Sequence, residues 1–219
     1  MEVHSTRSSP TVPRRVAVIH GYSASPDDHW FRWLSDQLES TGVPCEVPAL
    51  PDPRNPNPGA WKDALRRTVG VPDAGTAVVA HSLGCLATLR HLKTLEETEE
   101  LKGRSGSWRL GSLILVAGFI DRLPALPELD DFIGVGEDVT GLADHIDRTV
   151  VLRSDDDPLV PPALTDRLAV QLGVRARVVP GGGHFLSSDG FRTFPGVLGV
   201  LGGVPGVPGA PDGSDDADG

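Results

Sequence analysis

The stretch TAVVAHSLGCLATLRHL, residues 76–92, decides how the rest of the chain is interpreted. Its first half is apolar and β-branched, as in a buried strand, and its second half has leucines at helical spacing. Ser82 lies at the junction, and Gly84 follows two positions later. A serine on a sharp strand-to-helix turn is typical of a nucleophile elbow, although an ordinary turn between a strand and a helix shares the pattern. The other segments of the chain have to decide between the two.

Strand-like and helix-like segments alternate along the sequence. Apolar runs predict six strands, at 15–21, 45–50, 76–82, 111–119, 149–155 and 176–184. Amphipathic runs predict helices at 27–42, 60–70, 83–97, 162–173 and 190–201. This alternation predicts an α/β fold with three α/β/α layers and a six-stranded, mostly parallel sheet. With a reversal beside the first strand, the strand order is 2-1-3-4-5-6. The first of these helices is expected to begin at Asp27 or Asp28 as N-cap and to stop at Gly42.

The composition is that of one domain at 15–203, preceded by an arm at 1–14 and followed by a Pro/Gly/Asp tail at 204–219. The formal net charge of −10 argues against nucleic acid as a partner. No apolar run approaches the length of a membrane span, and no signal peptide is visible after Met1, so we expect a cytoplasmic protein without membrane contact. Cys45 and Cys85 are expected to be buried thiols rather than a disulfide or metal ligands.

Polar residues follow several of the predicted strands and should gather at the carboxyl edge of the sheet. They include Ser82, an acidic run at 155–157 and His184. The order serine, acid, histidine along the chain is that of the α/β-hydrolases, in which the histidine activates the serine and the acid orients the histidine. The residues alone leave the acid open among Asp155, Asp156 and Asp157, and Asp121 after the fourth strand is an outside candidate.

Two further histidines lie beside this set. His20 and Gly21 end the first strand, where hydrolases form the oxyanion hole, so the backbone N–H groups of Tyr22 and Leu83 are the predicted oxyanion donors. His20 itself is expected to be a hydrogen-bonded scaffold residue. His81 adjoins Ser82, and because side chains diverge on a sharp turn, it is not expected to act as the base.

Five motifs carry a resemblance to a known family: VIHGYSASPDDHWFRWL, PALPDP, VAHSLGCLATLRHL, SDDDPLVP and GGGHF. Over residues 15–201 the chain resembles the small serine hydrolases of the retinoblastoma-binding-protein-nine/YdeN family. The resemblance implies a compact α/β-hydrolase without a large cap domain, with Ser82 as nucleophile, Asp157 as acid and His184 as base. Ala80 stands where the fuller elbow motif has glycine. The charged linker at 96–110 looks longer than that family requires, and we expect it to leave the site unaffected.

The resulting hypothesis is a serine hydrolase of carboxylesterase type that transfers a small acyl group from an ester, thioester or amide to water, with no metal or organic cofactor. Residues 119–148 are long enough for a partial lid. Three aromatic residues are candidate pocket walls, although core packing explains them equally well: Trp30, Phe119 and Phe132. The alternatives are a protein-interaction module with a vestigial triad, and a cofactor-free perhydrolase or carbon–carbon hydrolase. The sequence leaves a protein partner open but does not indicate one.

Overall fold

The computed structural model describes residues 12–98 and 108–202. Most of the expected arm at 1–14, the middle of the charged linker at 96–110 and the whole tail at 204–219 therefore lie outside the described residues. Within those two ranges, no helix is both long enough and apolar enough to cross a membrane.

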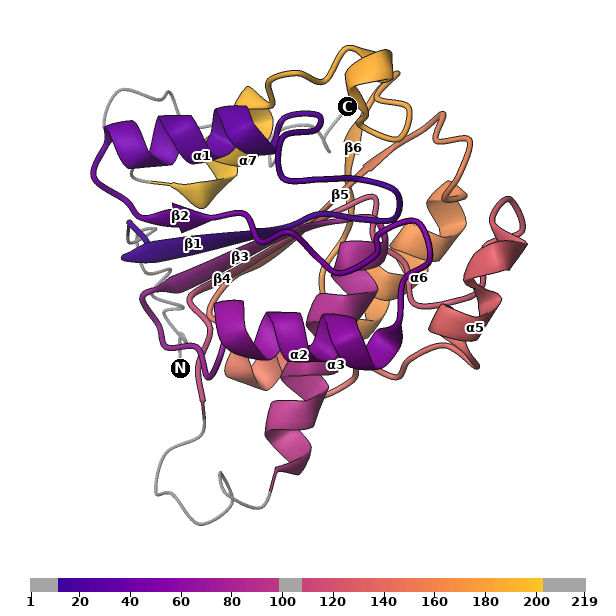
Figure 1. Cartoon of the computed structure of the whole chain (residues 1–219), viewed down its shortest axis with the longest axis horizontal. Helices are drawn as coiled ribbons and strands as arrows, with labels where there is room; N and C mark the ends of the chain where they lie inside the picture. The colour runs from indigo at the N-terminus through magenta and orange to yellow at the C-terminus, as the bar shows by residue number, and fades with distance from the viewer. Residues whose placement is uncertain (1–11, 99–107, 203–219) are drawn as a thin grey trace, which may run out of the picture.

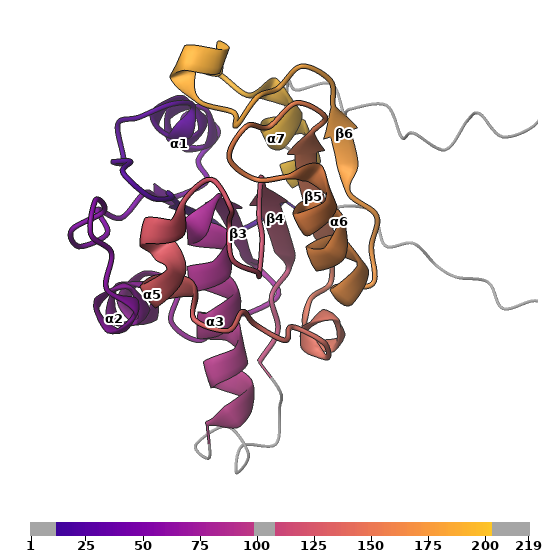
Figure 2. The same ribbon diagram turned by 90° about the vertical axis from the view of Figure 1, so that its right-hand side faces the viewer.

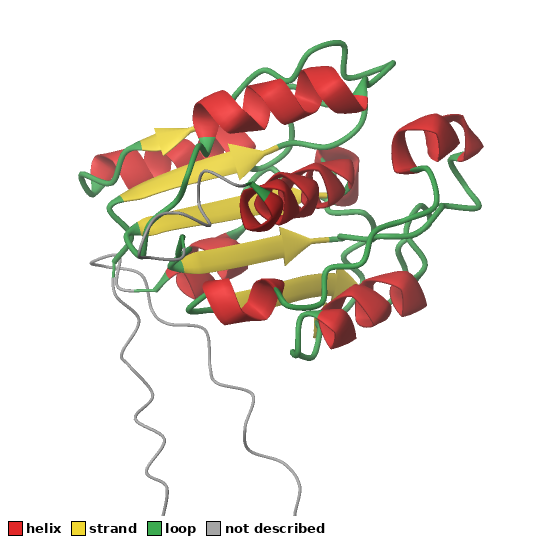
Figure 3. Ribbon diagram, turned by 90° about the horizontal axis from the view of Figure 1, so that it is seen from below, coloured by secondary structure: helices red, strands yellow, loops and turns green. Residues whose placement is uncertain are grey.

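All six strands run parallel in one sheet, in the predicted order β2-β1-β3-β4-β5-β6. Figure 3 shows the arrows pointing the same way across the sheet. The strands are β1 (Arg15–Ile19), β2 (Cys45–Glu46), β3 (Thr76–His81), β4 (Ser112–Val116), β5 (Thr149–Ser154) and β6 (Arg177–Val179). β2 is shorter than the run at 45–50 suggested, and Pro48, which has no N–H to donate, follows soon after its end.

Helices cover both faces of the sheet (Figure 1), as the alternating pattern predicted. One face is covered by α1 (Phe31–Ser40) and α7 (Pro195–Leu201). The other face is covered by α2 (Pro58–Thr68), α3 (Leu83–Glu97) and α6 (Pro162–Gln171).

Strand β1 shows how its alternate side chains serve the two layers. Val16 and Val18 belong to the core cluster under α1 and α7, whereas Ala17 and Ile19 belong to the cluster under α2 and α3. Side chains that alternate along a strand point to opposite faces of its sheet, so the last four residues of β1 are buried by one layer or the other.

The start of α1 differs from the prediction. The helix begins at Phe31, and neither Asp27 nor Asp28 caps it. The Asp28 carboxylate instead accepts hydrogen bonds from the N–H (2.7 Å) and the hydroxyl (2.8 Å) of Ser25, so it closes the preceding turn. The expected stop at the other end is present, because Gly42 follows the helix with a positive φ of 84°.

The chain between β4 and β5 makes an excursion that contains two short 3-10 helices and the one-turn helix α5 (Asp130–Ile133). Figure 2 shows α5 beside α2 and α3. Arg90 of α3 fastens it there, because its guanidinium donates to the carbonyl oxygens of Phe132 and Ile133 (both 2.7 Å) and pairs with Glu137 (2.9 Å).

Candidate active site

Ser82 lies on a strained corner between β3 and α3. Its backbone has φ 54° and ψ −125°, a region that costs a residue other than glycine roughly 1–3 kcal/mol. The neighbouring structure holds this conformation: the Ser82 N–H donates to the carbonyl of Val116, and the Ser82 carbonyl accepts from the N–H of Cys85, both at 2.9 Å. The corner thus has the geometry of a nucleophile elbow.

Two glycines allow the close packing around this corner. A Cβ atom on Gly84 would lie 2.4 Å from the carbonyl oxygen of His20, so only glycine lets α3 start this close to β1. A Cβ atom on Gly21 would lie 2.9 Å from the Cβ of Ser82. Ala80, by contrast, is a fully buried residue of β3, so an alanine fits where the longer motif has glycine.

Ser82, His184 and Asp157 form a continuous chain of hydrogen bonds. The Nε2 atom of His184 lies 2.9 Å from the Oγ of Ser82, and its Nδ1 atom lies 2.8 Å from Oδ2 of Asp157. The other carboxylate oxygen of Asp157 accepts the N–H groups of Leu159 and Val160, both at 2.9 Å. Because both oxygens of the Asp157 carboxylate accept hydrogen bonds, the orientation of this carboxylate toward His184 is fixed.

The other acid candidates have different partners. Asp155 accepts the N–H of Gly181 and Asp156 accepts the N–H of Gly183, each at 2.8 Å, so both carboxylates hold the loop that carries His184. Asp121 pairs with Arg167 at 3.4 Å. Of the four acids that the sequence left open, Asp157 is the one in contact with the histidine.

The predicted oxyanion donors lie beside Ser82. Leu83 is the first residue of α3, and N–H groups in a first helical turn have no acceptor within the helix. A Cβ atom on Gly21 would lie 3.4 Å from the backbone nitrogen of Leu83. The Gly21–Tyr22 segment therefore runs next to the start of α3. Among the described residues, the hydrogen bonds use neither the N–H of Tyr22 nor that of Leu83.

His20 is a scaffold residue, as predicted. Its Nδ1 donates to the carbonyl of Gly21 at 2.9 Å, and its Nε2 accepts the N–H of Leu50 at 3.1 Å. A ring that donates from one nitrogen and accepts at the other is neutral, and burial accordingly lowers the pKa of His20.

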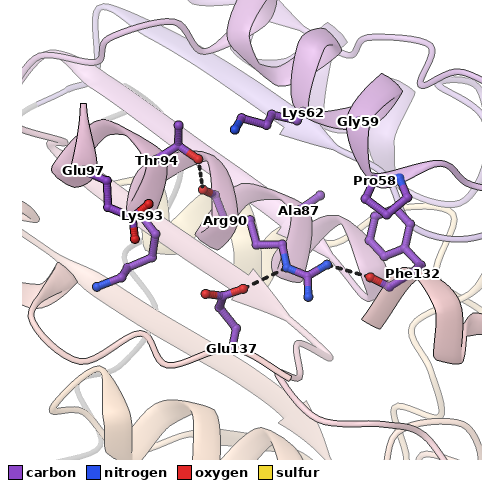
Figure 4. Close-up of a pocket in the computed structure, with 10 residues that line it drawn as sticks. All are labelled: Pro58, Gly59, Lys62, Ala87, Arg90, Lys93, Thr94, Glu97, Phe132 and Glu137. Atoms are coloured by element: carbon purple, nitrogen blue, oxygen red, sulfur yellow. Dashed lines mark hydrogen bonds and ion pairs between the residues drawn. The ribbon is translucent and has the colours of Figure 1, made fainter. Parts of the chain in front are cut away.

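The three aromatic residues considered as pocket walls lie in the core or at a cavity away from Ser82. Trp30 and Phe119 are completely buried and belong to the two core clusters, where a substrate has no surface to touch. Phe132 lines a cavity of about 270 Å³ between α2, α3 and α5 (Figure 4). The residues around that cavity include none of Ser82, Asp157 and His184.

Sequence reasoning missed the contacts that hold the histidine loop. Asp189 accepts the N–H groups of His184 (2.9 Å) and Leu186 (3.0 Å), and the hydroxyl of Ser154 donates to the carbonyl of Gly183 (2.6 Å). No local sequence pattern predicts these bonds, because they form only when the loop folds back on itself and packs against β5.

The two cysteines form no disulfide with each other. Cys85 is buried as expected, whereas Cys45 is only half-buried, and both are free thiols. Burial raises the pKa of Cys45 to about 11. No group of three or more His, Cys, Asp or Glu side chains in the described ranges is arranged to hold a metal ion.

A parallel sheet in this order, with a serine on a strained corner after its third strand, defines an α/β-hydrolase. The sequence agrees: a model of the family described as serine hydrolase matches residues 16–202. The chain belongs to this serine hydrolase family and is similar to YdeN of Bacillus subtilis. YdeN carries the name of a hydrolase and is 37% identical over 182 residues, which cover 83% of this chain and 91% of YdeN.

Solved structures agree with this assignment. The crystal structure of the Bacillus subtilis ydeN gene product matches with a TM-score of 0.76 at 36% identity, over 86% of this chain and 96% of that chain. A YdeN-like hydrolase of Pectobacterium atrosepticum matches with a TM-score of 0.53 at 18% identity, over 81% and 82% of the two chains. Est1E of Butyrivibrio proteoclasticus matches with a TM-score of 0.53 at 15% identity, over 81% of each chain. The last two likenesses concern the fold alone.

Proposed function

We propose that the protein cleaves an ester, thioester or amide of a small acyl group through a covalent acyl-enzyme on Ser82. The observation that carries the proposal is the hydrogen-bonded chain from Ser82 through His184 to Asp157, built on a strained corner. A serine hydroxyl is a weak nucleophile unless a base accepts its proton, and His184 is within hydrogen-bond reach of it.

In the first half of the reaction, the Ser82 oxygen attacks the acyl carbon while Nε2 of His184 takes the hydroxyl proton. The tetrahedral intermediate collapses when His184 returns that proton to the leaving group, which departs and leaves the acyl group on Ser82. In the second half, His184 deprotonates a water that attacks the acyl-enzyme, and it returns that proton to the Ser82 oxygen when the bond between this oxygen and the acyl carbon breaks. The products are a carboxylic acid and free Ser82.

The surrounding groups favour these steps in two ways. Asp157 accepts the Nδ1–H of His184, which leaves the lone pair on Nε2 facing Ser82 and stabilises the imidazolium when it forms. The N–H groups of Tyr22 and Leu83 are the proposed donors to the oxyanion. Donors that are already in place need no reorganisation when the charge develops, and the loss of one such donor costs about 10²–10³ in kcat in a serine protease.

The test is hydrolysis of a series of p-nitrophenyl acyl esters, together with labelling by a fluorophosphonate. Replacing Ser82 by alanine should abolish both, since loss of a triad serine costs on the order of 10⁶ in kcat. Ser40→Ala, at the exposed end of α1, is the matched control and should keep both. Ester hydrolysis that survives Ser82→Ala would refute the mechanism. A native protein that neither hydrolyses esters nor reacts with the fluorophosphonate would instead favour an interaction module.

A further inference from the structure

His81 is the last residue of β3 and the direct neighbour of Ser82, yet the proposed reaction makes no use of its side chain. It is 2% exposed, and its ring lies against the rings of Phe31 (5.7 Å between centroids) and Trp30 (6.1 Å). A polar ring buried among aromatic side chains is costly unless its polar atoms have partners. The partner that it does have identifies its role.

The protonation of His81 follows from that partner. Its Nε2 atom lies 2.8 Å from the backbone carbonyl oxygen of His184. A carbonyl oxygen only accepts, so the hydrogen is on Nε2, while the buried Nδ1 has no partner among the described residues. Burial and the nearby His184 hold the pKa of His81 well below its usual value. His81 is thus a neutral donor aimed at the backbone of the residue proposed as the base.

This bond holds a part of the chain that would not keep its shape alone. Gly183 and Phe185, on either side of His184, have positive φ values of 53° and 59°. The left-handed conformation is unfavourable for phenylalanine and persists only where neighbouring groups hold it. The side chain of Asp189 accepts the N–H of His184 at 2.9 Å, and the side chain of His81 donates to the carbonyl of His184. The backbone of His184 is therefore held on both its N–H and its carbonyl side.

We propose that His81 is a positioning residue that ties the corner carrying Ser82 to the loop carrying His184. This inference rests on the proposed function, because it explains how the Ser82 Oγ and the His184 Nε2 stay 2.9 Å apart. Ser82 and His81 share a peptide bond, so the hydrogen bond from His81 links the backbone of the nucleophile to the backbone of the base. Without the tie, both reactive groups remain, but the carbonyl of His184 loses its donor and the separation is held less tightly.

Two substitutions of equal length separate the donor from the bulk of the side chain. His81→Gln keeps an amide N–H near the place of Nε2, whereas His81→Met fills similar space and cannot donate. With p-nitrophenyl acetate, we expect His81→Met to lower kcat about 100-fold with KM within twofold, since a misplacement of about 1 Å can cost that much. His81→Gln should retain kcat within about tenfold. A merely structural role would lower the melting temperature of both variants and leave kcat of the folded protein unchanged.

The outcomes separate this inference from the proposed function. If the native protein hydrolyses the ester, Ser82→Ala does not, and folded His81→Met keeps native kcat, the inference is overturned while the proposed function stands. If Ser82→Ala keeps activity, the proposed function itself fails. Should His81→Met not fold, His81→Asn, whose amide is too short to reach, takes its place with the same expected loss. If neither folds, His81→Leu, which also cannot donate, takes their place: a kcat about 100-fold below that of native protein with His81→Gln within tenfold supports the tie, and equal kcat in both variants overturns it.

Discussion

Asp157 holds His184 with one carboxylate oxygen and its own loop with the other: Oδ2 lies 2.8 Å from His184 Nδ1, and Oδ1 accepts the backbone N–H groups of Leu159 and Val160. This division has a consequence for the Asp157→Asn variant. Its amide oxygen must stay on the two N–H donors, so its NH₂ group faces His184. A donor in that place forces the proton of His184 onto Nε2, where it points at Ser82.

The histidine of Asp157→Asn is therefore in the wrong tautomer to act as a base, and we expect kcat to fall by about 10⁴, as in the corresponding variant of a serine protease. The matched controls are Asp155→Asn and Asp156→Asn, whose amide oxygens can still accept the N–H groups of Gly181 and Gly183. Each should change kcat less than tenfold. Steady-state kinetics at equal circular dichroism would decide, and a crippled Asp155→Asn or Asp156→Asn would show that the acid is misassigned.

Gly84→Ala should destabilise the fold through one contact. The new Cβ would lie 2.4 Å from the carbonyl oxygen of His20 and 2.6 Å from that of Ile19, and a backbone carbonyl of a central strand has little room to move. We expect a loss of about 3 kcal/mol in the free energy of unfolding, measured with urea, because overpacking of this kind costs about 1–3 kcal/mol or more.

Gly59→Ala is the control for that substitution. Gly59 lies exposed in the first turn of α2, and the nearest atom to a new Cβ is the Asn57 side-chain oxygen at 3.3 Å. Its free energy of unfolding should change by about 1 kcal/mol or less. Equal effects at the two glycines would mean that the close approach of α3 to β1 is not what requires Gly84.

Stability should fall as the solution becomes acidic, because burial lowers the pKa of His20, His81 and His91. In the unfolded chain these histidines titrate near pH 6.5. Below that pH the unfolded state takes up protons that the folded state does not bind, so the free energy of unfolding decreases by up to about 1.4 kcal/mol per pH unit for each histidine. The loss continues until the pH reaches the lowered pKa of the folded state.

The measurement is urea unfolding at pH 7.5 and pH 5.5, for the native protein and for His91→Gln. His91 donates to the carbonyl of Gly70 at 2.8 Å, away from Ser82, and glutamine can replace this donor without titrating. Between the two pH values, the free energy of unfolding of the variant should fall less than that of the native protein, by at most about 1.4 kcal/mol. An identical pH dependence in both proteins would exclude His91 as a contributor.

The architecture could be predicted from the sequence because its signals are local. The helix at 83–97 and the strand order both follow from apolar periodicity and short connections, and both agree with the structure. The serine, acid and histidine could be brought together because parallel strands end at one edge of a sheet. Their catalytic roles remain proposals.

Other features depend on contacts between distant segments, which periodicity does not contain. Asp28 was expected to cap a helix because nothing in the sequence shows that its carboxylate accepts hydrogen bonds from Ser25 instead. Trp30 and Phe119 were candidate pocket walls because the sequence does not distinguish an aromatic side chain in the core from one that lines a cleft. The bond from His81 to His184 joins residues 103 positions apart and depends on a ring tautomer, so it had no local signal.

The edge position of β6 has a consequence for the order in which the molecule comes apart. β6 pairs with β5 alone, over three residues, and it leads into the loop that carries His184. Ser82, in contrast, follows β3, which has a paired neighbour on each side. Fraying starts where a strand has few partners, so the border of the sheet opens at a lower free energy than its centre. The proposed nucleophile thus follows a strand at the centre of the sheet and the proposed base follows a strand at its edge, so local opening of β6 loosens the base before it reaches the nucleophile.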